Sequence, residues 1–335
     1  MYESTRTIGP ERLMKQAGPV TRRKDFLSML DLDAVELEHC LELAARLKAD
    51  RSLGVQAPTA GVLTGRYVAM LFEKSSLRTR TTFEVAVREL GGRAIGLQPD
   101  VALGQREPVA DIARSLERWV DAVVIRTFSH RALEQFAGWA PKLHVINALT
   151  DDEHPCQVLA DMLTLRERWG SVRGRTIAFV GDGNNVATSL SYASAKLGIH
   201  LHVASPDGYQ LPPHVVQQST NAACHGARLR LFSEPADAVN GVDAVYTDTW
   251  TSMGKEAETG ARRAAFMGYQ VDDDLMSLAK PDACFMHCLP AHQGEEVTPE
   301  VFESAASVVF DQAENRLHAQ KALLVMLLTP QDGDL

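Results

Sequence analysis

The chain has 335 residues, of which 45% are hydrophobic and 23% are charged, and its net charge at neutral pH is −9. This length allows two domains, and the acidic balance argues against nucleic acid or an anionic membrane as the main partner. No apolar stretch reaches the roughly 18–20 residues that cross a bilayer, no secretory signal precedes the fold, and five scattered cysteines predict a reduced, cytoplasmic protein.

Residues 1–23 are polar and broken by two Gly-Pro pairs, so we expect an N-terminal extension outside the fold. From Phe26 onward, apolar runs typical of strands alternate with segments of helical period, which predicts parallel sheets covered by helices. The predicted helices are 30–47, 79–90, 109–119, 157–169, 185–197 and 315–328. The predicted strands are 67–72, 94–96, 122–127, 144–148, 176–180, 200–205, 244–248 and 284–289.

The alternation restarts after the helix that ends at Trp169-Gly170, which predicts an α/β protein with two doubly wound parallel-sheet domains linked by helices. We expect the first domain at 24–160, the second at 161–310, and the C-terminal helix of 311–335 packed back on the first. In open α/β sheets, ligands bind at the carboxyl ends of strands. Each chemistry-bearing motif of this chain falls at such an end.

The segment 75–84, SSLRTRTTFE, joins the predicted strand 67–72 to a helix. Free backbone N–H groups and the positive end of the helix dipole converge at such a junction. Ser76, Arg78, Thr79 and Arg80 add hydroxyls and guanidiniums, which favour a phosphate dianion. The alternative is an ordinary serine N-cap with arginines on a solvated face.

Two further motifs end strands in the first half of the chain. Arg126 finishes the run AVVIRT, where a charged residue is either a solvated edge or a ligand contact. In HPCQ, His154 can donate a hydrogen bond to a carbonyl oxygen on which negative charge develops, and Gln157 offers both a donor and an acceptor. A structural histidine is the alternative interpretation.

The segment GDGNNV, at 181–186, follows the strand 176–180 and opens a helix. The dinucleotide-binding fingerprint needs a third glycine that this segment lacks, so NAD binding is disfavoured. Two adjacent asparagines at a helix start can instead hold the carboxylate and ammonium of an amino acid. Asp248 ends the strand AVYTD and precedes the turn Ser252-Met253-Gly254, which suits a mobile loop that grips a cationic ligand.

The segment HCLP places Cys288 at the end of another strand, and Arg316 adds a cation in the last helix. The alternative for Cys288 is a buried structural thiol. Cys284 lies four residues before it, but no second Cys or His pair completes a zinc set, so we expect no structural metal.

These segments together resemble the aspartate/ornithine carbamoyltransferase family, and within it the ornithine-using branch. FEKSSLRTRTTFE is similar to the carbamoyl-phosphate signature of the family, and HPCQVLAD to its second phosphate-side motif. DTWTSMG and HCLP are similar to the motifs of the ornithine-using enzymes, and VFDQAENRLHAQKAL to the C-terminal helix. The resemblance runs in order from about Phe26 to Leu328.

The resemblance implies transfer of a carbamoyl group from carbamoyl phosphate to the δ-amine of ornithine, with Arg126, His154 and Cys288 at the reacting atoms. The residues it assigns to carbamoyl phosphate are Ser76, Leu77, Arg78, Thr79, Arg126, His154, Gln157, Cys288, Leu289 and Arg316. Those it assigns to ornithine are Asn185, Asp248, Ser252 and Met253. It also implies no metal or redox cofactor, and a homotrimer or a higher multiple with active sites between subunits.

Two positions depart from the family pattern, and residues 1–23 have no counterpart in it. Leu77 replaces a hydroxyl residue in the phosphate signature, which weakens one contact but keeps a backbone N–H. Ala102 replaces a longer polar residue, which puts one contact between subunits in doubt. The remaining alternatives are a carbamoyltransferase for putrescine or an N-acylated ornithine, and a catalytically silent homologue.

Overall fold

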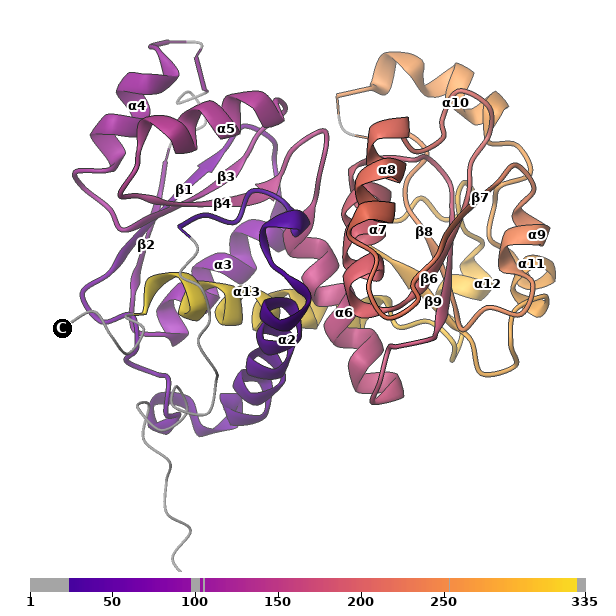
Figure 1. The fold of residues 1–335 in the computed structure, drawn as a ribbon, viewed down its shortest axis with the longest axis horizontal. Coiled ribbons are helices and arrows are strands. Elements are labelled where there is room, and N and C mark those ends of the chain that lie inside the picture. Colours follow the sequence, from indigo (N-terminus) through magenta and orange to yellow (C-terminus); the bar gives the residue numbers. More distant parts are fainter. Residues whose placement is uncertain (1–23, 98–102, 105, 253, 330–335) are drawn as a thin grey trace, which may run out of the picture. The chain divides into compact units, whose positions relative to one another are not determined.

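The computed structural model describes residues 24–97, 103–104, 106–252 and 254–329, and it divides them into two compact units (Figure 1). Unit 1 comprises the described residues of 24–27, 35–148 and 316–329, and unit 2 comprises those of 28–34 and 149–315. The predicted extension at 1–23 and the departure at Ala102 lie outside the described residues. Within the described part of the chain, no helix combines the length and apolarity that crossing a membrane requires.

Unit 1 is built on a four-stranded sheet in the order β2-β1-β3-β4, in which β1 pairs in parallel with both β2 and β3. The strands are β1 (Tyr67–Phe72), β2 (Arg93–Gly96), β3 (Ala122–Arg126) and β4 (His144–Leu149). The chain steps from β1 to β2 on one side and then crosses to β3 on the other. The order therefore reverses between β1 and β3, which makes their carboxyl ends the expected ligand position in this sheet.

The helices of unit 1 cover this sheet with apolar faces. They are α2 (Ala34–Ala49), α3 (Leu77–Glu89), α4 (Val109–Leu116), α5 (His130–Trp139) and the C-terminal part of α13 (Val309–Leu328), with the 3₁₀ segment η2 (Asp50–Gln56). Helices α4 and α5 lie side by side (Figure 1), and Ile112, Leu133 and Phe136 pack against strand residues such as Val123. Burial of these side chains provides the main stabilisation of the unit.

Unit 2 has a five-stranded parallel sheet in the order β7-β6-β5-β8-β9. The strands are β5 (Thr176–Val180), β6 (His200–Ala204), β7 (Leu229–Phe232), β8 (Ala244–Thr247) and β9 (Cys284–His287). The order reverses between β5 and β8, so their carboxyl ends form the second expected ligand position. Two parallel-sheet α/β units confirm the predicted fold class.

Helices cover both faces of this second sheet. Helices α7 and α8 lie on one face, whereas α9 and α11 lie on the other (Figure 1). The helices are α6 (Pro155–Trp169), α7 (Asn185–Leu197), α8 (Pro213–Asn221), α9 (Pro235–Val239), α10 (Thr259–Ala265), α11 (Asp273–Ser277), α12 (Pro299–Phe302) and the first part of α13, with η1 (Met29–Asp31) and η3 (Glu256–Glu258).

The predicted helix at 30–47 begins too early. Ser28 forms a capping box with Asp31, which closes a short 3₁₀ turn, and α2 starts only at Ala34. The Glu153 carboxylate accepts hydrogen bonds from the Ser28 hydroxyl and from the Met29 N–H at 3.1 Å. These bonds tie the turn to the segment just before α6 and explain why residues 28–34 belong to unit 2.

Replacing Asp243 by asparagine should lower the stability of unit 2 at neutral pH by about 1–3 kcal/mol. Asp243 is 3% exposed and accepts hydrogen bonds from Lys280 Nζ at 2.8 Å, Thr176 N–H at 2.9 Å and Arg175 Nη1 at 2.8 Å. Burial raises its pKa, but the three donors outweigh this, so the pKa is lowered overall. A lowered carboxyl pKa stabilises the fold above about pH 4, and the benefit is lost as pH falls through the folded value.

The measurement is the thermal midpoint of both proteins between pH 7 and pH 3. The gap between wild type and Asp243→Asn should be constant near neutrality and shrink below about pH 4. Asp237→Asn, an exposed position on α9, is the matched control. A gap that does not depend on pH would contradict the charge argument.

Candidate functional site

The ligand position of unit 1 gathers the residues predicted for a phosphate. Arg126 ends β3 directly beside Phe72, the last residue of β1, and it is 8% exposed. Ser76 is the N-cap of α3, and its Oγ accepts a hydrogen bond from the Thr79 N–H at 3.2 Å. The first turn of α3 and the Arg126 guanidinium therefore meet the same edge of the sheet.

Arg316, in α13, joins this group through Thr79. Its Nη2 donates to Thr79 Oγ1 at 2.6 Å, and both side chains are almost fully buried. Arg78 is half-buried, whereas the Leu77 side chain is 76% exposed. Because Leu77 stands at the first position of α3, it contributes a backbone N–H there while its side chain points to solvent. Unit 1 thus presents several cations and a helix N-terminus, which suit an anion.

Two residues that the sequence motifs did not single out hold this edge together. Both Glu73 carboxylate oxygens accept hydrogen bonds, one from the Leu103 N–H and the other from the Thr127 hydroxyl. The Lys74 ammonium lies 4.1 Å from the centroid of the Phe128 ring and is buried. These contacts join the segments that follow β1 and β3, so they support the positions of Ser76 and Arg126.

In unit 2, His154 is the N-cap residue of α6 and is 6% exposed. Its backbone N–H donates to the Asn185 carbonyl at 3.3 Å and to Ser189 Oγ at 3.0 Å. Ser189 Oγ donates in turn to the buried Glu153 carboxylate at 2.9 Å. The main chain of His154 is therefore fixed by α7 independently of its imidazole.

Gln157 belongs to a buried polar network around Asp161. Three donors converge on that carboxylate at 2.9 Å each: Gln157 Nε2, Gln312 Nε2 and the Tyr246 hydroxyl. Burial raises the pKa of Tyr246 well above its ordinary value, and the negative charge of Asp161 raises it further, so the phenol stays protonated. Gln312 Oε1 also accepts the His287 N–H at 3.0 Å. The network links α6 to the end of β9.

The ligand position of unit 2 brings the asparagine pair beside Asp248. Asn184 Oδ1 caps α7 by accepting the N–H groups of the second and third residues that follow it, and its Nδ2 donates to Asp248 Oδ2 at 2.7 Å. Asn185 Nδ2 donates to the Thr150 carbonyl at 2.6 Å. The sequence motif predicted Asn185 as a ligand residue, but it did not indicate that Asn184 orients Asp248.

Cys288 meets Asp248 directly. Its Sγ donates to Asp248 Oδ1 at 2.9 Å, and the Thr249 N–H donates to the same oxygen at 2.8 Å. The Asp248 carboxylate thus accepts hydrogen bonds from a thiol, an amide side chain and a backbone N–H, and no cationic side chain is among these donors. A carboxylate in this setting suits a cationic amine. Ser252 is half-buried in the following loop, and Met253 lies outside the described residues.

Arg262, on α10, holds the segment that follows Asp248 and joins it to the turn between β5 and α7. Its Nη1 donates to the Trp250 carbonyl at 2.9 Å and to Asp182 Oδ2 at 2.7 Å, and its Nε donates to Glu258 at 2.9 Å. Burial raises the pKa of the Asp182 carboxyl, and the ion pair with Arg262 offsets only part of that rise. No sequence motif indicated Arg262, because its partners lie up to 80 residues away.

Gly183→Ala should destabilise the protein by about 1–3 kcal/mol through overpacking. A Cβ at this position would lie 2.5 Å from the Gln210 carbonyl carbon and closer still to the Leu211 nitrogen, and both are backbone atoms. Relief of this clash must shift either the turn that carries Gly183 or the backbone of Gln210 and Leu211. The check is the thermal midpoint, with Gly138→Ala on α5 as the matched control, because nothing lies within 4 Å of the added methyl there. A midpoint equal to that of wild type would contradict this account.

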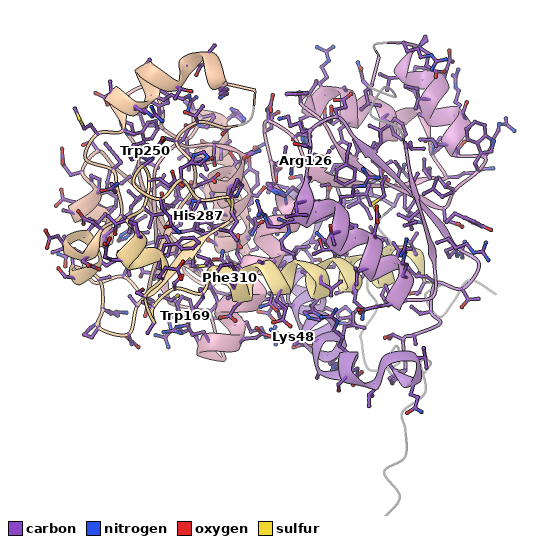
Figure 2. The ribbon with its side chains drawn as sticks, turned by 180° about the vertical axis from the view of Figure 1, so that it is seen from behind. Lys48, Arg126, Trp169, Trp250, His287 and Phe310 are labelled. Carbon is purple, nitrogen blue, oxygen red and sulfur yellow. The ribbon has the colours of Figure 1, made fainter. Side chains whose placement is uncertain are left out.

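Asp248, His287 and Cys288 place one metal-binding atom each within 4.8 Å of one another. Each of these groups already has a protein partner, however. Cys288 donates to Asp248, while the His287 ring contacts Leu289 N–H and Glu296. The donor set is therefore satisfied by the protein itself, and we assign no metal to it. Figure 2 shows His287 among the side chains of unit 2 and Arg126 in unit 1.

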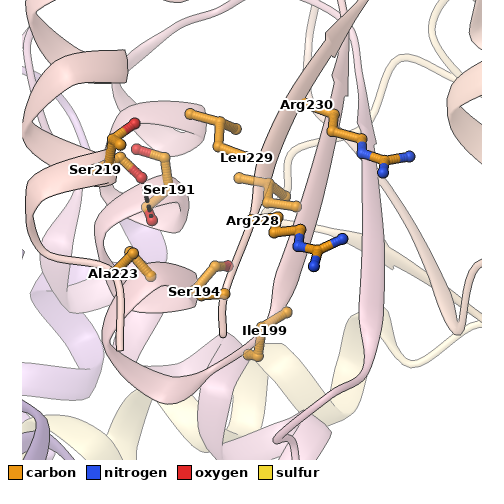
Figure 3. A pocket seen from close by; sticks show the side chains of 12 residues that line it. Ser191, Ser194, Ile199, Ser219, Ala223, Arg228, Leu229 and Arg230 are labelled. Carbon is orange, nitrogen blue, oxygen red and sulfur yellow. Dashed lines mark hydrogen bonds between the residues drawn. The ribbon is translucent and has the colours of Figure 1, made fainter. Parts of the chain in front are cut away.

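A cavity of about 300 Å³ in unit 2 lies apart from these residues. Its walls come from α7, α8, β6 and β7, and they include Ser194, Ile199 and Leu229. In Figure 3 the labelled serines lie on one side of the cavity, and the guanidiniums of Arg228 and Arg230, on the other side, point away from them. None of the residues predicted for a substrate lines it, so it is not part of the candidate site.

The chain matches two protein-family models in succession. Residues 24–167 match the carbamoyl-phosphate-binding domain of aspartate/ornithine carbamoyltransferases, and residues 173–327 match their aspartate/ornithine-binding domain.

Curated relatives and solved structures agree with these matches. The ornithine carbamoyltransferase of Symbiobacterium thermophilum is 50% identical over 91% of this chain and 98% of its own, and that of Acidothermus cellulolyticus is 51% identical over 92% and 98%. The solved ornithine carbamoyltransferase of Pyrococcus furiosus is 44% identical with a TM-score of 0.89, and the two chains are covered to 95% and 100%. The chain therefore belongs to the aspartate/ornithine carbamoyltransferase family.

Proposed function

We propose that the protein is an ornithine carbamoyltransferase, which transfers the carbamoyl group of carbamoyl phosphate to the δ-amine of L-ornithine and yields L-citrulline and phosphate. The observation that carries the proposal is the charge at the two ligand positions. Arginines and a helix N-terminus in unit 1 suit a dianion, and the Asp248–Cys288 pair in unit 2 suits a cationic amine. The two matching family models, one for carbamoyl phosphate and one for aspartate or ornithine, support the same pair of substrates.

The residues proposed for carbamoyl phosphate carry donors or positive charge. Arg126 and the N-terminus of α3 hold the phosphate, and Arg316 keeps Thr79 in place by donating a hydrogen bond to its hydroxyl. His154 donates to the carbonyl oxygen as it becomes an oxyanion, and Gln157 contacts the carbamoyl group. The full set is Ser76, Leu77, Arg78, Thr79, Arg126, His154, Gln157, Cys288, Leu289 and Arg316.

The residues proposed for ornithine are Asn185, Asp248, Ser252 and Met253. An alkyl amine has a pKa near 10.4, so removing its proton at pH 7 costs about 4–5 kcal/mol. In the proposed mechanism Asp248 grips the amino-acid end of ornithine, and Cys288 stands near the δ-amine. Water accepts the proton that the ammonium releases, and the free amine then attacks the carbonyl carbon. The bond to the phosphate oxygen breaks, and the phosphate leaves with the electron pair and takes the second proton from the nitrogen.

The wider setting of the enzyme is also part of the proposal. It works in arginine metabolism, in the cytoplasm, as a homotrimer or a higher multiple with active sites between subunits. The described cysteines support a reducing compartment, because none of the five forms a disulfide. The proposed domains are 24–160 for carbamoyl phosphate and 161–310 for ornithine, with residues 311–335 assigned to the first. The donor is already activated, so the reaction includes no metal and no redox cofactor.

The decisive experiment measures product formation from carbamoyl phosphate with ornithine, putrescine and N-acetylornithine side by side. A clear preference for ornithine supports the proposal. Preference for putrescine would overturn the proposed grip on the amino-acid end, and preference for N-acetylornithine would mean that the Asp248 loop leaves room for an acyl group. If no amine reacts, the protein is a silent homologue, and the exposed Leu77 becomes the first position to revert to a hydroxyl residue.

A further inference from the structure

The buried His287 ring, at the carboxyl end of β9, uses both of its nitrogens. Nδ1 accepts a hydrogen bond from the Leu289 N–H at 2.9 Å, and Nε2 lies 3.1 Å from Glu296 Oε1. The side chains of His287 and Glu296 are both 0% exposed. The proposed reaction mechanism gives neither of them a role, although they flank the segment that carries Cys288.

These contacts determine where the proton of the imidazole lies. A backbone N–H can only donate, so Nδ1 must be the unprotonated nitrogen, and Nε2 carries the proton that it donates to Glu296. The His292 N–H donates to the same Glu296 oxygen at 2.6 Å. The carboxylate therefore selects one tautomer of His287 and holds the ring in one orientation.

The residue that this ring holds has an unfavourable backbone conformation. Leu289 has a φ of +58°, in the left-handed region that a branched residue rarely adopts. Such a conformation persists only where its surroundings hold it. The hydrogen bond from the Leu289 N–H to Nδ1 stabilises this conformation. The His287 N–H, at the start of the turn, donates to Gln312 Oε1 at 3.0 Å and fixes that end.

Cys288 lies between these two fixed residues, and its Sγ donates to Asp248 Oδ1. We propose that Glu296 and His287 are positioning residues: Glu296 fixes the His287 tautomer, and Nδ1 of that tautomer holds the Cys288–Leu289 turn against Asp248. The proposal rests on the proposed function, because it assigns the turn to the substrate amine and the carbamoyl group. A shift of the turn would displace both Cys288 and Leu289 from the reacting atoms.

Two substitutions by amide residues distinguish the role of Nδ1 from the role of Nε2. In His287→Asn the amide oxygen can take the place of Nδ1 and accept the Leu289 N–H. In His287→Gln the longer amide can reach Glu296, but it leaves the Leu289 N–H without its acceptor. We expect His287→Asn to keep at least about 10-fold more kcat/KM for ornithine than His287→Gln, whose loss should reach about 10²-fold.

A second readout does not depend on turnover. The rate of Cys288 alkylation by iodoacetamide, with the site identified by peptide mass spectrometry, should rise in His287→Gln because Sγ no longer lies against Asp248, and should stay near wild type in His287→Asn. His202→Asn and His202→Gln are the matched control pair, since the His202 ring contacts the Ala238 carbonyl elsewhere in unit 2. Both should leave the alkylation rate and the kinetics unchanged.

If the two folded His287 variants have equal kinetics and equal alkylation rates, or if His287→Gln is closer to wild type, the proposal is overturned. Should His287→Gln not fold, Glu296→Gln and Glu296→Ala give the same comparison, because only the amide keeps an acceptor for the Nε2 proton. Equal behaviour of those two variants would also overturn the proposal. A wild-type protein that makes no citrulline would remove the proposed function, while the order of alkylation rates would still test the positioning role.

Discussion

Replacement of His154 by alanine should lower kcat for citrulline formation by roughly 10²–10³-fold, the usual effect of removing one donor to a developing oxyanion. The imidazole is the part of the residue that can reach a substrate. The backbone N–H is already bound to the Asn185 carbonyl and to Ser189, so alanine keeps the start of α6 in place. The expected loss is therefore chemical and not a loss of fold.

The check is a full steady-state analysis with both substrates, together with the thermal midpoint of the variant. His214→Ala, an exposed position on α8, is the matched control and should change neither value. A His154→Ala enzyme that turns over at the wild-type rate would remove His154 from the mechanism. A large fall in the thermal midpoint would show that its ring is structural.

Sheet strands and their order along the chain could be predicted well because burial on both faces makes parallel strands continuously apolar. The predicted bounds of β1, β5 and α7 equal the observed ones. Strand β7 (Leu229–Phe232) was missed, since it is an edge strand whose pattern includes the exposed Arg230. Its identity depends on pairing with β6 and not on its own composition.

The residues of the candidate site likewise fall into those that the sequence could predict and those that it could not. Motifs at strand ends indicated Arg126, Asn185, Asp248 and Cys288, because topology forces such ends to one edge of a sheet. The orienting roles of residues such as Asn184, Arg262 and Glu296 were missed. Each acts through a partner in another element, and a buried polar group reveals its role only when the fold shows which group satisfies it.

Replacement of Asp248 by asparagine should lower kcat/KM for ornithine by roughly 10²–10³-fold, since losing one partner of a buried charge pair costs about 2–5 kcal/mol. The side chain is 9% exposed and accepts from Asn184, Cys288 and the Thr249 N–H. An amide has the same shape, but it lacks the charge that attracts the amine, and its NH₂ group would face a donor. The KM for carbamoyl phosphate should change little.

Asp243 provides the control at the opposite end of the same strand, because it directly precedes β8 whereas Asp248 directly follows it. Asp243→Asn should lower the thermal midpoint and leave kcat/KM for ornithine unchanged. Asp248→Asn should lower kcat/KM for ornithine and change the thermal midpoint little. The contrast separates two uses of a buried carboxylate: at the amino end of the strand it pairs with Arg175 and Lys280, and at the carboxyl end it faces the ligand position. If Asp248→Asn lowered only the thermal midpoint, its carboxylate would be structural, and the proposed ornithine grip would be wrong.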